Sequence, residues 1–311
     1  MKYSKLIFTL TNIVLVVALA VWALHHISLS DMLSSFAALP KDVLLYVFAL
    51  NILVMLIYGT RVQVLADSRF TPALQTAWLG FGLNGIFPMR LGDLARIFYA
   101  RRLLGASASR VTAIFAMEKI FDLAAIVVLG LIVMQFIAFK GVNSGVKVLI
   151  AVLMVAILGL LILHRVIPGK AVSKHPVAVW LWEVTQSIKK KITRETLLKS
   201  GVLTLLIWGT TIATTFVMFA AIHPGFSWLD ACLLTLILVL AIAIPGAPAG
   251  LGLVEAAIVG YLHSATNLNM ANAIAAAFAF HLISAIPQIA GAIVLIGMLQ
   301  LRSKGKTAIK S

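Results

Sequence analysis

The feature that most constrains this chain is a set of apolar runs, each almost free of charge and about long enough to cross a bilayer. A hydrocarbon core of ~30 Å takes about 20 helical residues at ~1.5 Å each. The runs are continuous and lack the alternating pattern of outer-membrane barrel strands. They therefore predict an all-α, polytopic membrane protein. The six long transmembrane helices are expected at residues 6–24, 41–59, 111–139, 146–164, 201–221 and 271–301.

Composition excludes a soluble globular enzyme. Hydrophobic residues make up 62% of the chain and charged residues only 11%, against about 25% charged in ordinary soluble domains. The net charge of +15 could suggest a nucleic-acid partner, but the charges lie beside apolar runs and not on a basic folded surface. Topology and anionic lipid explain them better, so no nucleic-acid partner is expected.

The first apolar run resembles a secretory signal, since Lys2 and Lys5 precede it and Ala18-Leu19-Ala20 mimics a cleavage site. The run continues past those alanines, which is typical of a membrane span. We therefore expect an uncleaved first helix.

Charge in the loops predicts the orientation. Most of the 25 Lys and Arg lie in the amino end, in residues 60–71, 90–110 and 165–200, and in the carboxyl tail. This distribution places both termini in the cytoplasm, with the protein in the plasma membrane of a prokaryote. If 60–71 and 90–110 share one face, the stretch between them enters and leaves by that face. Such irregular backbone survives at membrane depth only inside protein or beside a wet cavity. The sequence thus predicts a re-entrant hairpin at 72–105.

Residues 176–195 mix Trp180 and Trp182 with three consecutive lysines, Lys189 to Lys191. One interpretation is an interfacial helix on an anionic leaflet. The other is a solvated loop helix.

The chain also carries an internal repeat. Shifting it so that Pro88-Met-Arg-Leu-Gly92 meets Pro248-Ala-Gly-Leu-Gly252 aligns the same order of spans and broken hairpins. An odd number of spans separates equivalent points, so the copies are inverted, as in many transporters that bind substrate near the midplane. The alternative is a duplicated scaffold with no transport role. We expect one integral membrane domain over 1–311, with copies at 1–140 and 146–301 and a second re-entrant hairpin at 231–262.

The first broken segment brings charge to a helix break. Arg90 and Arg96 can each donate parallel hydrogen bonds to a lipid phosphate and stay charged throughout. The alternative is that they are ordinary cytoplasmic anchors. The predicted substrate-binding residues are Asn84, Arg90, Asp93 and Arg96, and the predicted hairpin-breaking residues are Pro88, Gly92, Pro245, Pro248, Gly250 and Gly252.

Four further charged residues fall within apolar surroundings and must face protein or water. One interpretation is a structural network in which Arg90, Arg96 and Lys119 neutralise Asp93, Glu118 and Asp122. The other is that the same network is a gate that opens when lipid phosphate takes an arginine. Glu255 is a candidate proton carrier, a partner for an arginine, or a carboxylate that complements a helix dipole. His281 is expected to be a hydrogen-bonded packing residue, the alternative being a proton relay. The predicted gating or coupling residues are Glu118, Lys119, Asp122 and Glu255.

No other chemistry is legible. The sequence has no HExxH motif, nucleophile elbow or phosphate loop, and its single cysteine, Cys232, excludes a cysteine metal cluster. We therefore expect no enzyme activity, no metal and no cofactor.

Three segments together resemble the membrane domain of the lysylphosphatidylglycerol synthase/flippase family: NGIFPMRLGDLARIFYARRL, FAMEKIFDL and PGAPAGLGLVEAAIVGYL. The resemblance covers nearly the whole chain. The family's Pro-x-Arg-x-Gly-Asp pattern falls on Pro88 to Asp93, and its turn glutamate on Glu255. Ala247 and Ala249 depart from the family's more glycine-rich turn, which suggests a stiffer second hairpin.

The resemblance implies movement of lipids between leaflets, with aminoacylated phosphatidylglycerol, isoprenoid-linked lipids or hopanoids as cargo. The aminoacyl-transferase domain of the family is missing, so the chain should not make its own cargo. The function expected is therefore a flippase for a phosphate-bearing lipid, a phospholipid or a polyprenyl phosphate, with a lipid-synthesising enzyme as a possible partner. The alternative is a membrane-embedded lipid-modifying enzyme or an accessory subunit of a glycosyltransferase or lipid synthase.

Overall fold

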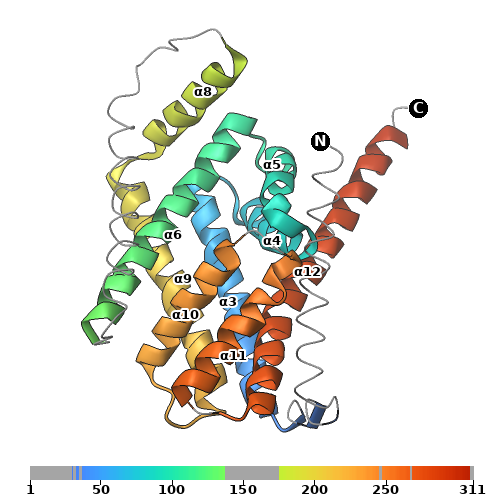
Figure 1. Cartoon of the computed structure of the whole chain (residues 1–311). Coiled ribbons are helices and arrows are strands. Elements are labelled where there is room, and N and C mark those ends of the chain that lie inside the picture. Colours follow the sequence, from blue (N-terminus) through green and yellow to red (C-terminus); the bar gives the residue numbers. More distant parts are fainter. Residues whose placement is uncertain are drawn as a thin grey trace. The chain divides into compact units, whose positions relative to one another are not determined.

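The computed structural model is helical throughout the part of the chain that it describes (Figure 1). Nine α-helices and two short 3-10 helices account for this part, which confirms the all-α prediction there. The spans expected at 6–24 and 146–164, and Pro245 in the second hairpin, lie outside the described residues. The structure describes residues 30, 33–34, 37–136, 175–244, 247–266 and 268–308.

Three of the described helices are long and apolar enough to cross a membrane. They are α3 (Lys41–Ala66), α9 (Arg194–Ala220) and α12 (Met270–Ala308), and they cover the runs predicted at 41–59, 201–221 and 271–301. Pro287 lies inside α12.

A fourth long helix, α6 (Ala108–Phe136), occupies the run predicted at 111–139. It carries Glu118, Lys119 and Asp122 in its first half. These charges require polar partners within the protein wherever the helix is surrounded by hydrocarbon.

Both broken segments fold as pairs of short helices. The first pair is α4 (Phe70–Ile86) and α5 (Leu91–Leu104), joined by the 3-10 helix η1 (Pro88–Arg90). The second is α10 (Trp228–Ala243) and α11 (Leu253–Thr266), with η2 (Pro248–Gly250) between them. Each of these helices has 14 to 17 residues, fewer than the about 20 that a full crossing takes.

The chain divides into two compact units, and each draws on both halves of the sequence. The first unit contains residues up to 53, 78–96 and 211 onward. The second contains 54–77 and 97–210. Both breaks, η1 and η2, belong to the first unit.

Within the first unit, α10, α11 and α12 pack side by side (Figure 1). Their shared core contains Leu234 of α10, Ile258 and Leu262 of α11, and the buried Ala276 and Ala277 of α12. Small residues let helix backbones approach closely in a membrane, where packing and not water exclusion drives association.

The amino end of α10 is fixed by a capping box. The Ser227 side chain accepts a hydrogen bond from the Asp230 amide, and the Asp230 carboxylate accepts one from the Ser227 amide at 2.7 Å. The Tyr261 hydroxyl of α11 donates to the other Asp230 oxygen at 2.6 Å. These bonds satisfy the free amides of α10 and tie α10 to α11 far from the break.

Glycines bring α4 against α12. A methyl group at Gly82 would overlap the Gln288 carbonyl oxygen, and one at Gly291 would overlap the Trp78 ring. The Trp78 indole donates to the Pro287 carbonyl at 3.2 Å. The close approach and this hydrogen bond hold the first hairpin on the last helix.

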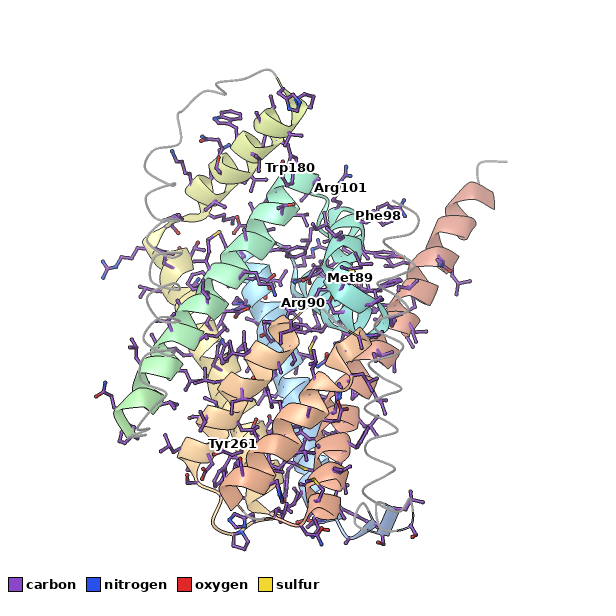
Figure 2. The ribbon with its side chains drawn as sticks, viewed as in Figure 1. Met89, Arg90, Phe98, Arg101, Trp180 and Tyr261 are labelled. Carbon is purple, nitrogen blue, oxygen red and sulfur yellow. The ribbon has the colours of Figure 1, made fainter. Side chains whose placement is uncertain are left out.

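In the second unit, α8 (Pro176–Lys191) packs on α6. Val177, Trp180 and Leu181 are exposed on α8, and Figure 2 labels Trp180 on this helix. The carboxyl end of α8 carries the three lysines, of which Lys191 pairs with Asp67. An exposed apolar patch beside lysines suits the interfacial interpretation, which stays a prediction.

Gly82→Ala should destabilise the protein, because the added methyl group must displace the backbone of α12. Overpacking of this kind costs about 1–3 kcal/mol. Thermal unfolding in detergent should show a lower Tm. The matched control is Gly297→Ala on α12, where a methyl group meets no atom within 4 Å. An equal loss of Tm in both variants would contradict this account of the packing.

Candidate functional site

The two backbone breaks contact each other and share one conformation. η1 and η2 are in contact in the first unit. The middle residue of each adopts left-handed backbone angles, with φ 57° and ψ 23° at Met89 and φ 56° and ψ 3° at Ala249. The residues that follow, Arg90 and Gly250, also have positive φ, 56° and 77°. Residues that the internal repeat aligns thus have matching local geometry.

This conformation is strained wherever the residue is not glycine. Met89, Arg90 and Ala249 all carry a Cβ in the left-handed region, which costs on the order of 1–3 kcal/mol per residue at such positions. The surrounding contacts must therefore hold the junction of the two breaks in place.

Arg90 supplies one of those contacts. Its Nε and Nη2 donate to the Ile242 carbonyl oxygen at 3.2 and 2.9 Å. α10 ends at Ala243, so this carbonyl has no donor within its own helix. Arg90 is exposed, and no described residue accepts a hydrogen bond from its Nη1. The guanidinium therefore stabilises the end of α10 and keeps donors available.

Asn84 and Asp93 lie across the first break from each other. The Asn84 amide nitrogen donates to the Asp93 carboxylate at 2.9 Å. Gly92 allows this approach, because a side chain there would collide with the backbone of Leu83 and Asn84. The pair ties α4 to α5, and its predicted role in binding substrate stays a prediction.

Arg96 is buried and not a surface anchor. Only 6% of the residue is exposed, and its Cδ and Nε lie where a Gly80 side chain would be. The first hairpin thus encloses one of its two predicted phosphate-binding arginines and exposes the other.

Glu255 and His281 form a buried pair on α11 and α12. One Glu255 oxygen accepts from the Gly252 amide at 2.7 Å, and the other lies 2.6 Å from His281 Nδ1. Glu255 therefore complements the amino end of α11, as one interpretation of the sequence expected. Its second partner is His281, which was predicted to be a hydrogen-bonded packing residue but without a named partner.

The second unit holds a separate polar cluster around Arg61, which is fully buried. Arg61 Nη1 and Nη2 donate to the two Asp122 oxygens at 2.7 and 3.2 Å. Nη1 also donates to Thr204 Oγ1 at 3.0 Å, and Glu118 lies 3.9 Å from Nη2. The Tyr58 ring stacks 5.0 Å from the guanidinium. One arginine thus joins α3, α6 and α9.

Sequence reasoning missed Arg61 because the apolar run was expected to end at residue 59 and the loop to begin at 60. In the structure α3 continues to Ala66, which corrects that boundary and removes Arg61 from the cytoplasmic loop. Lys119, one of the partners expected for Asp122, is exposed. Two carboxylates on one apolar helix required a buried cation, and this was the signal that could have found it.

The sequence of the chain matches the model of a known protein family over most of its length. The model for the lysylphosphatidylglycerol synthase TM region matches residues 9–292. The chain belongs to this family. No curated protein matches the chain. As a member of a transmembrane-region family with long apolar helices, the protein is integral to a membrane.

The family region contains both groups of polar residues described above. The junction offers an exposed guanidinium beside freed backbone groups, which suits an anionic oxygen ligand. The Arg61 cluster is buried and internally hydrogen-bonded, which suits a role in holding three helices together.

Arg61→Leu should destabilise the protein strongly, because it leaves the half-buried Asp122 and the buried Glu118 without their cation. Loss of one member of such a pair costs about 3–5 kcal/mol. Unfolding in detergent should show the loss, and Arg61→Leu with Asp122→Leu should recover much of it. Arg194→Ala, at an exposed position on α9, is the control. If the double variant is no more stable than Arg61→Leu, the pairing is not what holds the helices.

Proposed function

We propose that the protein moves a phosphate-bearing lipid between the leaflets of its membrane. The observation that carries the proposal is Arg90, an exposed guanidinium held between the two backbone breaks with donors still available. The family also supports it, since its description names lysylphosphatidylglycerol, a phosphate-bearing lipid.

The proposal treats the two halves of the chain as inverted repeats with re-entrant hairpins. The recurring order of long helix, broken pair and long helix supports this, as do the similar left-handed backbone angles at Met89 and Ala249. In that arrangement both termini lie in the cytoplasm, and the breaks meet near the midplane, where such transporters bind substrate.

The hydrogen bond from Arg90 to Ile242 suits exchange. A backbone carbonyl is neutral, whereas a phosphate is charged and accepts two parallel bonds, and charge-assisted bonds are about twice as strong. A headgroup that reaches the junction therefore competes with the carbonyl for the guanidinium. Binding the lipid releases the end of α10.

The protein then acts without making or breaking a covalent bond. The apolar tails stay in the bilayer, so only the headgroup needs shelter while it crosses. Arg90 and Arg96 neutralise its charge, and Asn84 with Asp93 keeps the first break folded. On this proposal the chain is a lipid transporter and not an enzyme.

Arg90→Ala should lower the rate of lipid movement at least about tenfold, which corresponds to the loss of ~1.4 kcal/mol of phosphate binding. Arg90→Lys keeps the charge but not the paired donors, so its rate should lie between those of the parent and Arg90→Ala. The measurement is movement of labelled phosphatidylglycerol and polyprenyl phosphate in proteoliposomes.

Arg101→Ala is the matched control for Arg90, since Arg101 is an exposed arginine on α5 away from the break (Figure 2). Equal rates in Arg90→Ala and the parent would remove Arg90 from the site. If the folded parent moves neither lipid, transport of these lipids is refuted. Chemical turnover of either lipid would instead favour the embedded enzyme.

Gly80→Ala tests Arg96 without removing its charge. The added methyl group would occupy the space of the Arg96 side chain and displace the guanidinium. Lipid movement should fall, while Gly260→Ala, where the methyl group meets open space, should behave as the parent does. Unchanged transport in folded Gly80→Ala would show that the position of Arg96 is not important.

A further inference from the structure

Glu255 and His281 form a buried ionisable pair that has no role in the lipid binding proposed above. Only 8% of Glu255 and 9% of His281 are exposed, and His281 Nδ1 lies 2.6 Å from a Glu255 oxygen. The two side chains come from α11 and α12, which pack along each other. The phosphate-binding role proposed for the arginines makes no use of this pair.

The pair can hold one exchangeable proton. With a neutral imidazole and an ionised carboxylate it carries one negative charge, and with a protonated imidazole it is neutral overall. A net charge is costly in an apolar interior. Burial therefore favours the proton-loaded pair, and contact with water permits its release. Histidine is the side chain suited to this exchange between about pH 5 and 8.

The helices packed around the pair bring no competing cation to Glu255 among the described residues. α10 contributes Cys232 and Asp230, and Asp230 is bonded to Tyr261 of α11. The other histidine of α11, His263, is exposed. α4 has no ionisable side chain.

η1 contacts η2 and carries one charged residue, Arg90. Arg90 donates to the Ile242 carbonyl and not to Glu255. Besides its contact with His281, the Glu255 carboxylate accepts a hydrogen bond from the neutral Gly252 amide. The proton on the imidazole is therefore the charge that decides whether the pair is neutral.

The pair is mechanically linked to the junction. Glu255 accepts from Gly252, two residues after η2, and Arg90 holds the other side of the same break at Ile242. A headgroup that displaces Arg90 from Ile242 frees the break and so alters what surrounds Glu255.

We propose that Glu255 and His281 form a proton-binding site that couples lipid movement to a transmembrane pH gradient. The inference rests on the proposed transport function. A proton enters from water on one side onto the imidazole, is carried while the pair is buried, and leaves to water on the other side. No covalent bond to lipid changes.

The test reconstitutes the parent in vesicles with a pH difference of one unit and the membrane potential clamped at zero. The probes are labelled phosphatidylglycerol and polyprenyl phosphate. One proton per lipid should drive the leaflet ratio of a transported lipid toward about tenfold, because one pH unit corresponds to ~1.4 kcal/mol. His281→Gln should still move lipid but settle at equal leaflets, since glutamine can donate to Glu255 but does not take up a proton.

Glu255→Gln with His281→Gln serves as the second variant, because it leaves no buried charge if the single variant fails to fold. His263→Gln is the matched control and should keep the gradient response. Movement by the parent that ignores the gradient, or a gradient response that survives in both site variants, overturns the coupling and leaves the transporter intact. Absence of movement of either lipid by the parent overturns the transport function and the coupling together.

Discussion

A helix that stops inside a membrane leaves carbonyl and amide groups that hydrocarbon cannot satisfy. At the second break, two charged side chains satisfy backbone groups of this kind. Arg90, from the other hairpin, donates to a carbonyl at the end of α10, and Glu255 accepts the Gly252 amide before α11. Each charge also interacts favourably with the helix dipole, because Arg90 lies at the carboxyl end of α10 and Glu255 at the amino end of α11. The break depends on both.

The same constraint links binding to conformation. A residue that completes a helix end can turn all of its donors to a ligand only by leaving that helix end incomplete. Arg90 is such a residue, since its exposed guanidinium is bonded to a neutral carbonyl and not to a carboxylate. The left-handed backbone at Met89, Arg90 and Ala249 means that the contacts at the junction also restrain a strained turn.

The positions of the breaks could be predicted from the sequence. Proline and glycine interrupt otherwise apolar runs, and the aligned Pro88 and Pro248 each begin a 3-10 helix. The long helices could be predicted for the same reason, because length and hydropathy are local properties. Partners could not. Glu255 lies 26 residues before His281, and only the packing of α11 on α12 brings them together.

Arg61 shows why helix ends are the weakest part of such predictions. A cation just beyond an apolar run is read as a loop residue by the positive-inside rule. Here the helix goes on past it, and Thr204 of α9 and Asp122 of α6 surround the guanidinium. The acidic residues of α6 were visible in the sequence, but the helix that supplies their cation depends on tertiary packing.

The capping box at Ser227 and the bond from Tyr261 to Asp230 fix one end of the second hairpin. The opposite end is held at α10 by hydrogen bonds from one side chain of another hairpin. Once Arg90 leaves Ile242, the hairpin is clamped at its base alone, and like a cantilever it deflects most at its tip. Its softest mode displaces Pro248 to Gly250 and leaves the base still, so a spectroscopic label would report the motion best at that tip.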